Sequence, residues 1–240
     1  MVAEKRNVFI VIKEAALLQL ILSTLEAFVV QHLEKKTHNK YLETYGLLWG
    51  SFIRILGNNT QNFIYTISHV TIDTSAKRSK SSVEPNDQAL ILKKDIITSY
   101  WPYYKFLGDF HTHPYKRKKN FNYKDVERDR LFEFSKDDFA SIEDFPEYWY
   151  EHNYRVGIVV TIIDMERATK KVEQVKDSLL VFNLGNYRLW IKGYWVSYKD
   201  KNKAELIDDI YISCPQITGM HEFTQFGRFR SGQHEEGEIG

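Results

Sequence analysis

The sequence predicts a domain of the α/β or α+β class with a mixed sheet, on three observations. Helical and strand-like patterns alternate irregularly along the 240 residues. The run RVGIVVTII (155–163) is almost wholly apolar, as expected of a buried strand. Residues 13–35 carry apolar side chains at helical spacing, with one face to bury. A chain of this length suits one sizeable domain, with or without an appendage.

The first half of the chain predicts two strands that form a hairpin, placed between two helices. Two Asn residues mark the hairpin turn, and Ser and Lys mark a loop. In chain order, the predicted elements are a strand (7–12), a long helix (13–35), two strands (45–56 and 62–72) that turn at Asn58-Asn59, a polar loop (73–87) and a second helix (88–100).

The second half predicts four further strands and one helix, followed by an appendage. Ser135 is the expected N-cap of the helix, with acidic residues in its first turn. In chain order, the elements are a strand from Phe106 to about His113 that Pro114 ends, a charged excursion from the fold (115–133), a helix from Ser135 to about Tyr150, the buried strand 155–163, two strands (179–182 and 187–196) and an appendage (199–240) whose last dozen residues predict disorder.

The composition indicates neither a nucleic-acid nor a membrane partner. Lys and Arg total 33 and Asp and Glu 32, so the net charge is only +1 and no global attraction to a polyanion is expected. The apolar stretch 15–33 is interrupted below membrane-spanning length by Gln19, Glu26, Gln31 and His32. The sequence does not indicate an oligomeric state.

The cysteine content and the N-terminus favour a cytoplasmic protein. Cys214 is the single cysteine, so no internal disulfide can form, which suits a reducing compartment. Glu14 interrupts the first apolar run, and no small-residue cleavage site follows it, so the start does not read as a signal peptide. We therefore expect a cytoplasmic location.

A His-x-His pair predicts a metal site. His111 and His113 lie at the end of a strand-like run, where positions i and i+2 point to the same face. Pro114 is expected to end the strand and leave both rings at a sheet edge that a substrate can reach. A catalytic zinc site needs a third protein ligand and one open position. Asp125 and Asp138 are the two candidates for that ligand.

These parts together resemble the JAB/MPN (JAMM) zinc metalloproteases. That family has an early Glu, then His-x-His-Pro, then Ser-x-x-Asp at the start of a helix; here these are Glu43 in LETYGLLWG, HTHP at 111–114 and SKDD at 135–138. The resemblance covers about residues 8–196. It implies an MPN-type domain over 1–198, with a curved mixed sheet flanked by a long N-terminal helix and further helices, a charged insertion at 115–133 and an appendage at 199–240.

The choice between the two carboxylates rests on the helix that follows each. In the family the interval after His-x-His-Pro is usually short, and Asp125 keeps it short, but Asn122 then stands in place of the Ser. Asp138 keeps the Ser, keeps the helix start and leaves a short path to the strand at Val156. We therefore expect Asp138 to be the ligand, with Asp125 as the alternative. Ser-x-x-Asp is also the ordinary pattern of a helix capping box.

The resemblance also implies a mechanism and a substrate. Zinc held by His111, His113 and Asp138 would lower the pKa of a water to about 7. Glu43 would take its proton and pass it to the leaving amine, and Ser135 would stabilise the oxyanion. The implied activity is that of a prokaryotic deubiquitinase-like isopeptidase, which cuts after the C-terminal glycine of a ubiquitin-like protein or its conjugates.

Two alternatives belong to other classes. One is a non-catalytic MPN module that acts as a scaffold of a larger assembly; such modules typically lack the metal ligands that this chain retains. The other is a metallohydrolase of small amide or sulfur-carrier conjugates, which the sequence does not separate from the first reading. The basic run at 116–119 (KRKK) is expected to be a solvated loop, with a role in substrate choice as its alternative.

Overall fold

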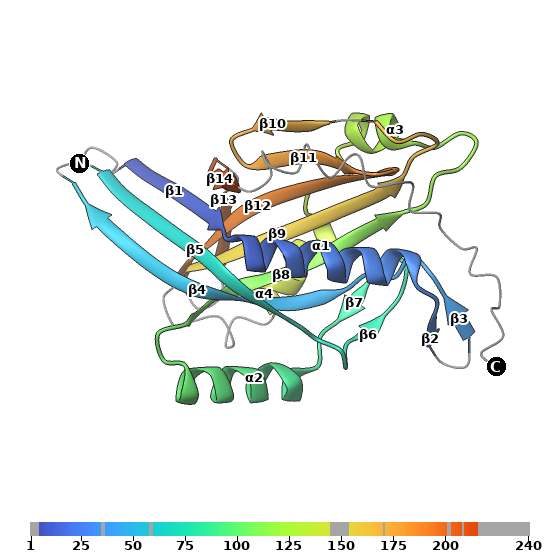
Figure 1. Ribbon diagram of the computed structural model, residues 1–240. Coiled ribbons are helices and arrows are strands. Elements are labelled where there is room, and N and C mark those ends of the chain that lie inside the picture. The colour runs from blue at the N-terminus through green and yellow to red at the C-terminus, as the bar shows by residue number, and fades with distance from the viewer. Residues whose placement is uncertain are drawn as a thin grey trace.

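One large, curved mixed sheet forms the body of the protein (Figure 1). The computed structural model describes residues 5–34, 37–57, 60–144, 154–169, 171–200, 203–207 and 209–215. Within these ranges the sheet has 10 strands, in the order β10-β11-β12-β9-β8-β4-β5-β1-β14, with β13 paired to β12. The strands are β1 (Lys5–Ile12), β4 (Tyr45–Leu56), β5 (Thr60–Ile72), β8 (Lys105–Tyr115), β9 (Tyr154–Asp164), β10 (Val172–Lys176), β11 (Leu179–Leu184), β12 (Tyr187–Asp200), β13 (Lys203–Ile207) and β14 (Tyr211–Ser213).

The pairing of the strands confirms the mixed α/β class in this coarse form. β4 and β5 pair antiparallel as the predicted hairpin, whose turn at residues 58–59 lies outside the described ranges. β1 is parallel to β5, and β8 is parallel to β9. Two small hairpins stand apart from the large sheet: β2 (His32–Glu34) with β3 (Thr37–Asn39), and β6 (Lys77–Arg78) with β7 (Val83–Glu84). The second of these lies inside the polar segment 73–87, which the sequence predicted as a plain loop.

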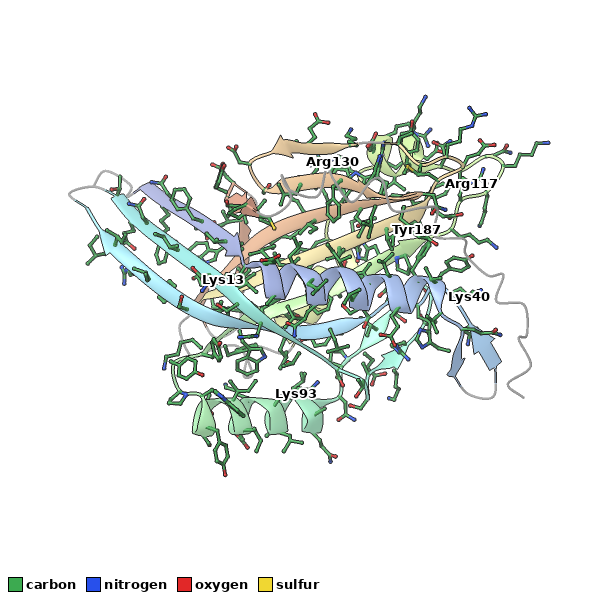
Figure 2. The ribbon with its side chains drawn as sticks, viewed as in Figure 1. Lys13, Lys40, Lys93, Arg117, Arg130 and Tyr187 are labelled. Atoms are coloured by element: carbon green, nitrogen blue, oxygen red, sulfur yellow. The ribbon has the colours of Figure 1, made fainter. Side chains whose placement is uncertain are left out.

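Four helices pack around the sheet within the described ranges: α1 (Glu14–Val29), α2 (Asp87–Tyr100), α3 (Tyr123–Arg128) and α4 (Lys136–Asp144). α1 crosses the sheet, packs on β5 and β9, and buries Leu17, Leu20 and Phe28 (Figure 1). In Figure 2, Tyr187 lies near one end of α1, where its ring packs edge-to-face on Phe28. Among the described helices, none has both the length and the apolar character needed to cross a membrane.

α1 ends well before the predicted boundary at residue 35. The N–H groups of Tyr41 and Leu42 donate to the carbonyls of Phe28 and Ala27, and Val30 N–H closes the last turn on Glu26. Carbonyls at a helix end have no partner inside the helix, so returning chain can satisfy them. The predicted helix was too long because Leu33 continues the helical spacing of apolar residues, although it lies in the strand β2.

The opposite face of the sheet carries two further apolar clusters, and both hold parts of the candidate site in place. One packs Tyr45, Leu47 and Trp49 of β4 with Leu90 of α2; Lys93 of α2, labelled in Figure 2, also donates to the Ile72 carbonyl at 2.7 Å. The other joins the α3 region to the sheet through Val126, Phe132, Ile163, Leu179, Val181 and Trp190.

The segment 115–133 is therefore not an excursion from the fold, and that prediction was wrong. Val126 is fully buried and Phe132 nearly so, both against β9, β11 and β12. The many charges hid this packing, because only a few apolar side chains of a short helix need to face the sheet, and six helical residues are too few for a clear period.

The described part of the C-terminal appendage belongs to the same sheet. β13 pairs antiparallel with β12, and β14 pairs in parallel with β1. Ile212 N–H also donates to the Asp177 carbonyl, at 2.7 Å, just after β10. The two ends of the strand order thus meet at β14, and the sheet is nearly closed. The expected boundary at residue 198 falls inside β12.

Candidate metal centre

β8 carries both histidines on one face of the sheet. It runs between β4 and β9, and its last pairing with β4 joins His111 to Tyr45. The strand does not end at Pro114, as predicted, but continues to Tyr115 beside Ile163 of β9. Thr112 N–H points toward the β4 side and donates to the Thr44 carbonyl, so the nitrogen of Pro114, two residues on, faces the side where β4 is absent. No ladder hydrogen bond is lost there.

The two imidazoles and one carboxylate converge on a single point. Nε2 of His111 lies 3.1 Å from Nε2 of His113. Each of these nitrogens lies 3.3 Å from an oxygen of Asp138, His111 from Oδ1 and His113 from Oδ2. Both histidines are buried, and Asp138 is partly buried. Of the two carboxylates that the sequence left open, the structure therefore brings Asp138 to the histidines.

The hydrogen bond on the far side of His113 fixes which nitrogen faces the cluster. Nδ1 of His113 lies 3.2 Å from the main-chain carbonyl of Leu131. A carbonyl can only accept, so Nδ1 carries a hydrogen. Nε2 is then left either to bind a metal through its lone pair or, in the protonated ring, to donate to Asp138 Oδ2 at 3.3 Å. An imidazole that donates its outer N–H to a carbonyl is the usual arrangement of a metal ligand.

These distances fit a tetrahedral zinc site. Four ligand atoms at about 2.0–2.1 Å from zinc lie about 3.3 Å from one another. The separation of the two imidazole nitrogens, 3.1 Å, and that of each nitrogen from its nearer Asp138 oxygen, 3.3 Å, are close to that spacing. Two imidazoles and a carboxylate are also a donor set that zinc accepts. The residues present would therefore hold a zinc ion with little rearrangement.

Ser135 and Asp138 form a capping box at the start of α4. Ser135 N–H donates to Asp138 Oδ2 at 2.7 Å, and Asp138 N–H donates to Ser135 Oγ at 3.1 Å. The capping box weighed as the ordinary reading of Ser-x-x-Asp is thus real, and it coexists with the contacts to both histidines. Although burial opposes it, the hydrogen bonds from His111 and His113 hold the pKa of Asp138 far below its usual range.

Asp125 lies in a second capping box, at α3. Its Oδ2 accepts from Asn122 N–H at 2.7 Å, and its Oδ1 accepts from Arg128 at 2.8 Å. Asn122 accepts in turn from the backbone of the first turn. Both oxygens of Asp125 are therefore engaged within the helix, and the structure does not bring Asp125 to the histidines.

Glu43 reaches the same cleft from the residues that lead into β4. Its N–H donates to the Ser79 carbonyl at 2.8 Å, and the next residue, Thr44, exchanges hydrogen bonds with Thr112 of β8. A cleft of about 390 Å³ is lined by Glu43, both histidines, Ser135 and Asp138. Burial raises the pKa of Glu43 to about 7; His113 opposes this shift and Asp138 adds to it.

The cleft wall also contains a buried ion pair that was not predicted from the sequence. Arg155 donates through Nε and Nη2 to the two oxygens of Asp109, and all of Asp109, Arg155 and Tyr45 line the cleft. Asp109 stands two residues before His111, so strand alternation alone placed it on the same face. Arg155 had no such signal, because it reaches Asp109 only through the parallel register of β8 and β9.

Comparison with known proteins adds little to this picture. No protein-family model matches the chain, and no curated protein matches it. Among solved structures, it is similar to the solution structure of a protein from Desulfitobacterium hafniense, at 12% identity over 85% of this chain and 92% of that one, with a TM-score of 0.41. Function is therefore inferred from the chemistry of the site itself.

Proposed function

We propose that this protein is a zinc-dependent peptidase or isopeptidase of the JAB/MPN type. One observation carries the proposal: two imidazole nitrogens and a carboxylate converge at zinc-like spacing in a cleft that Glu43 and Ser135 also line. The fold supports it in outline, since α1 packs across a curved mixed sheet and precedes the strand that follows Glu43. An MPN-type domain is the finer fold that we infer from these parts.

Each residue of the cleft has a chemical role in this proposal. A bound Zn²⁺ supplies a Lewis acid that acidifies water and polarises a carbonyl oxygen. His111, His113 and Asp138 would hold it. Glu43, with its pKa raised to about 7, can take up a proton and release it again at neutral pH.

In this proposal, Ser135 stabilises the developing oxyanion. Its oxygen accepts the capping hydrogen bond from Asp138 N–H at 3.1 Å, so its own O–H can donate to another acceptor. Because Ser135 lines the cleft beside the metal ligands, that acceptor would be the substrate's carbonyl oxygen as charge builds on it.

The substrate that we propose is the C-terminal tail of a ubiquitin-like protein, cut after its last glycine. This class comes from the resemblance to the JAB/MPN metalloproteases. A tail that ends in glycine can lie extended and approach closely a metal whose ligands are themselves buried. The hydrolysed bond would be a peptide bond or an isopeptide bond to a lysine.

A panel of ubiquitin-like proteins, each fused through its C-terminal glycine to a reporter, tests the proposal. We expect one or more fusions to be cut after the glycine by zinc-loaded protein and left intact after chelation. Glu43→Gln is the matched control: it should keep zinc and lose cleavage by at least about 100-fold. If zinc-loaded protein cuts none of the fusions but hydrolyses small amide conjugates, the proposed substrate is wrong and small amide conjugates take its place.

A further inference from the structure

We propose that Arg188 of β12 is a positioning residue for His113: it holds α3 on the sheet, and so sets the place of the Leu131 carbonyl that accepts from His113 Nδ1. The inference rests on the metal site of the proposed function, but not on the substrate. It gives residues 121–134, here called the α3 segment, a role in positioning His113 rather than in substrate choice.

The α3 segment touches both histidine ligands from outside the cluster. The Leu131 carbonyl lies 3.2 Å from His113 Nδ1. The ring of Phe134 packs on the ring of His111, with centroids 5.5 Å apart. Since Leu131 acts through its main chain, its own side chain does not determine the contact. What matters is where the whole segment lies relative to β8.

The segment's own structure is too short to fix that place. α3 has six residues, and a helix of this length is not stable by itself in water. Leu131 N–H returns to the carbonyl of Val126, which ties Leu131 to the helix. Arg130, labelled in Figure 2, has a φ of 53° in the turn between them. The position of the Leu131 carbonyl therefore follows the position of α3 on the sheet.

Arg188 makes two directional contacts with α3 from the sheet. It is buried on β12, and its Nε donates to Asn183 Oδ1 of β11 at 3.0 Å. Its Nη1 donates to Glu127 of α3 at 3.1 Å. Its guanidinium also lies over the ring of Tyr123, the first residue of α3, at 3.8 Å from the centroid. One planar group thus fixes the start and the middle of α3.

Apart from Arg188, α3 is held mainly by apolar packing and by Lys171, which lies 4.0 Å from Glu127, while Phe134 N–H, after Leu131, donates to Tyr194 of β12 at 2.8 Å. Val126 and Phe132 bury area against the sheet, but burial has no preferred direction and tolerates small sliding. A guanidinium held at Asn183 and bonded to a carboxylate admits one geometry. We infer that without Arg188 the segment stays on the sheet while the Leu131 carbonyl loses its fixed distance to His113.

The Nδ1 proton of His113 in the zinc-loaded protein tests this inference directly. Long-range ¹H–¹⁵N spectra of the zinc-loaded wild type should show this proton protected from exchange with water by the Leu131 carbonyl. Arg188→Gln should bind zinc but show this proton exchanging faster with water. Competition with a chromophoric chelator should show that its zinc affinity is about tenfold weaker, the size expected of an outer-shell change.

Two control variants separate positioning from general loss of stability. Arg128→Gln removes the same kind of side chain from α3, but one that is exposed and bonded only within the helix to Asp125 and Asp129. Val8→Ala weakens the core at β1, which β4 and β5 separate from β8 in the strand order. Both variants should keep the wild-type protection of the His113 Nδ1 proton and the wild-type zinc affinity.

Glu127→Gln and Arg188→Lys serve if Arg188→Gln does not fold, because the first keeps a polar acceptor without the charge and the second keeps the charge without the planar guanidinium. A folded variant at either position with wild-type protection of the His113 Nδ1 proton and wild-type zinc affinity would overturn the inference, as would a loss of that protection in Val8→Ala. Wild-type protein that binds zinc but cuts no ubiquitin-like fusion would refute the proposed function and leave this inference standing.

Discussion

Asp125 and Asp138 both cap the start of a helix, but their carboxylates contact different side chains. Each accepts from the backbone N–H of its N-cap at 2.7 Å and so starts a helix. The remaining contacts of Asp125 go to Arg128, whereas those of Asp138 go to His111 and His113. The pattern of a capping box could not distinguish them, because the distinction lies in what the fold places opposite each carboxylate.

The shared capping role makes the pair a matched test of the third ligand. Asp138→Asn should lose more than about 100-fold in zinc affinity, because it removes a ligand rather than an outer-shell partner. Asp125→Asn should keep wild-type zinc content and lose about 1 kcal/mol of stability from the weakened cap. Zinc content by elemental analysis and urea unfolding measure the two effects. Zinc lost only with Asp125→Asn would exchange the two assignments.

Glu43 makes the stability of the metal-free protein depend on pH. Burial raises its pKa from 4.5 to about 7, so the folded state binds a proton that the unfolded state has released. The stabilising contribution of that proton is fully present below about pH 4.5 and is lost as the pH rises through about 7.

Glu43→Gln removes this dependence. With chelator present, the free energy of unfolding of the variant relative to wild type should rise by about 3 kcal/mol between pH 4.5 and pH 8. Urea unfolding of both proteins at several pH values across this range measures the difference. A difference that stays constant over the whole range would show that the carboxyl of Glu43 is not held protonated by the fold.

At the level of elements, the sequence predicted strands better than the contacts between them. β4 coincides with the predicted 45–56, and β5 begins only slightly before the predicted 62, because runs of apolar and β-branched residues report burial directly. His111 and His113 were found for the same reason, since period-two alternation needs no knowledge of the fold.

What the sequence did not predict depends on register and on main-chain groups. The Arg155–Asp109 pair exists because β9 lies parallel to β8 at one register. The contact of the Leu131 carbonyl with His113 is made by the main chain, so no residue type in the sequence indicates it. Pro114 was expected to end its strand. It costs no ladder hydrogen bond because the pairing of β4 with β8 does not extend beyond His111. Each of these is a property of two segments together, which no single stretch of sequence contains.

Gly108 of β8 has no room for a side chain. Its φ is +149°, and a Cβ would lie 1.8 Å from the Val156 carbonyl oxygen, where β8 meets β9 just before the histidines. Gly108→Ala should cost about 3 kcal/mol or more in the free energy of unfolding. Chemical denaturation of the chelator-treated variant measures it without any contribution from metal.

Gly193→Ala provides the comparison for Gly108, because Gly193 also lies in a central pairing of the sheet. A Cβ there would meet first the terminal methyl of Ile210, at 3.0 Å, which is the end of a flexible side chain. The cost should therefore be smaller than at Gly108. Equal losses for the two variants would show that the main-chain contact at Val156 can relax.

Across the whole molecule, stability depends on the meeting of the two ends of the sheet at β14. Ile212 is fully buried in the main core, while its neighbour Tyr211 is 44% exposed. Ile212→Ala should cost about 2–4 kcal/mol in the free energy of unfolding, and Tyr211→Ala clearly less. Denaturation of both variants tests whether the described part of the C-terminal region belongs to the cooperative unit.

The pairing of β1 with β14 also sets an order of events. Phe9 meets Tyr211 across about 200 residues of chain, so β1 can find this neighbour only after nearly all other strands have been made. On a ribosome, β1 would emerge early and wait with one edge unpaired. Contacts of such long sequence separation slow folding and expose strand edges to other chains. A growing chain of this protein is therefore a candidate client for chaperones that shield strand edges.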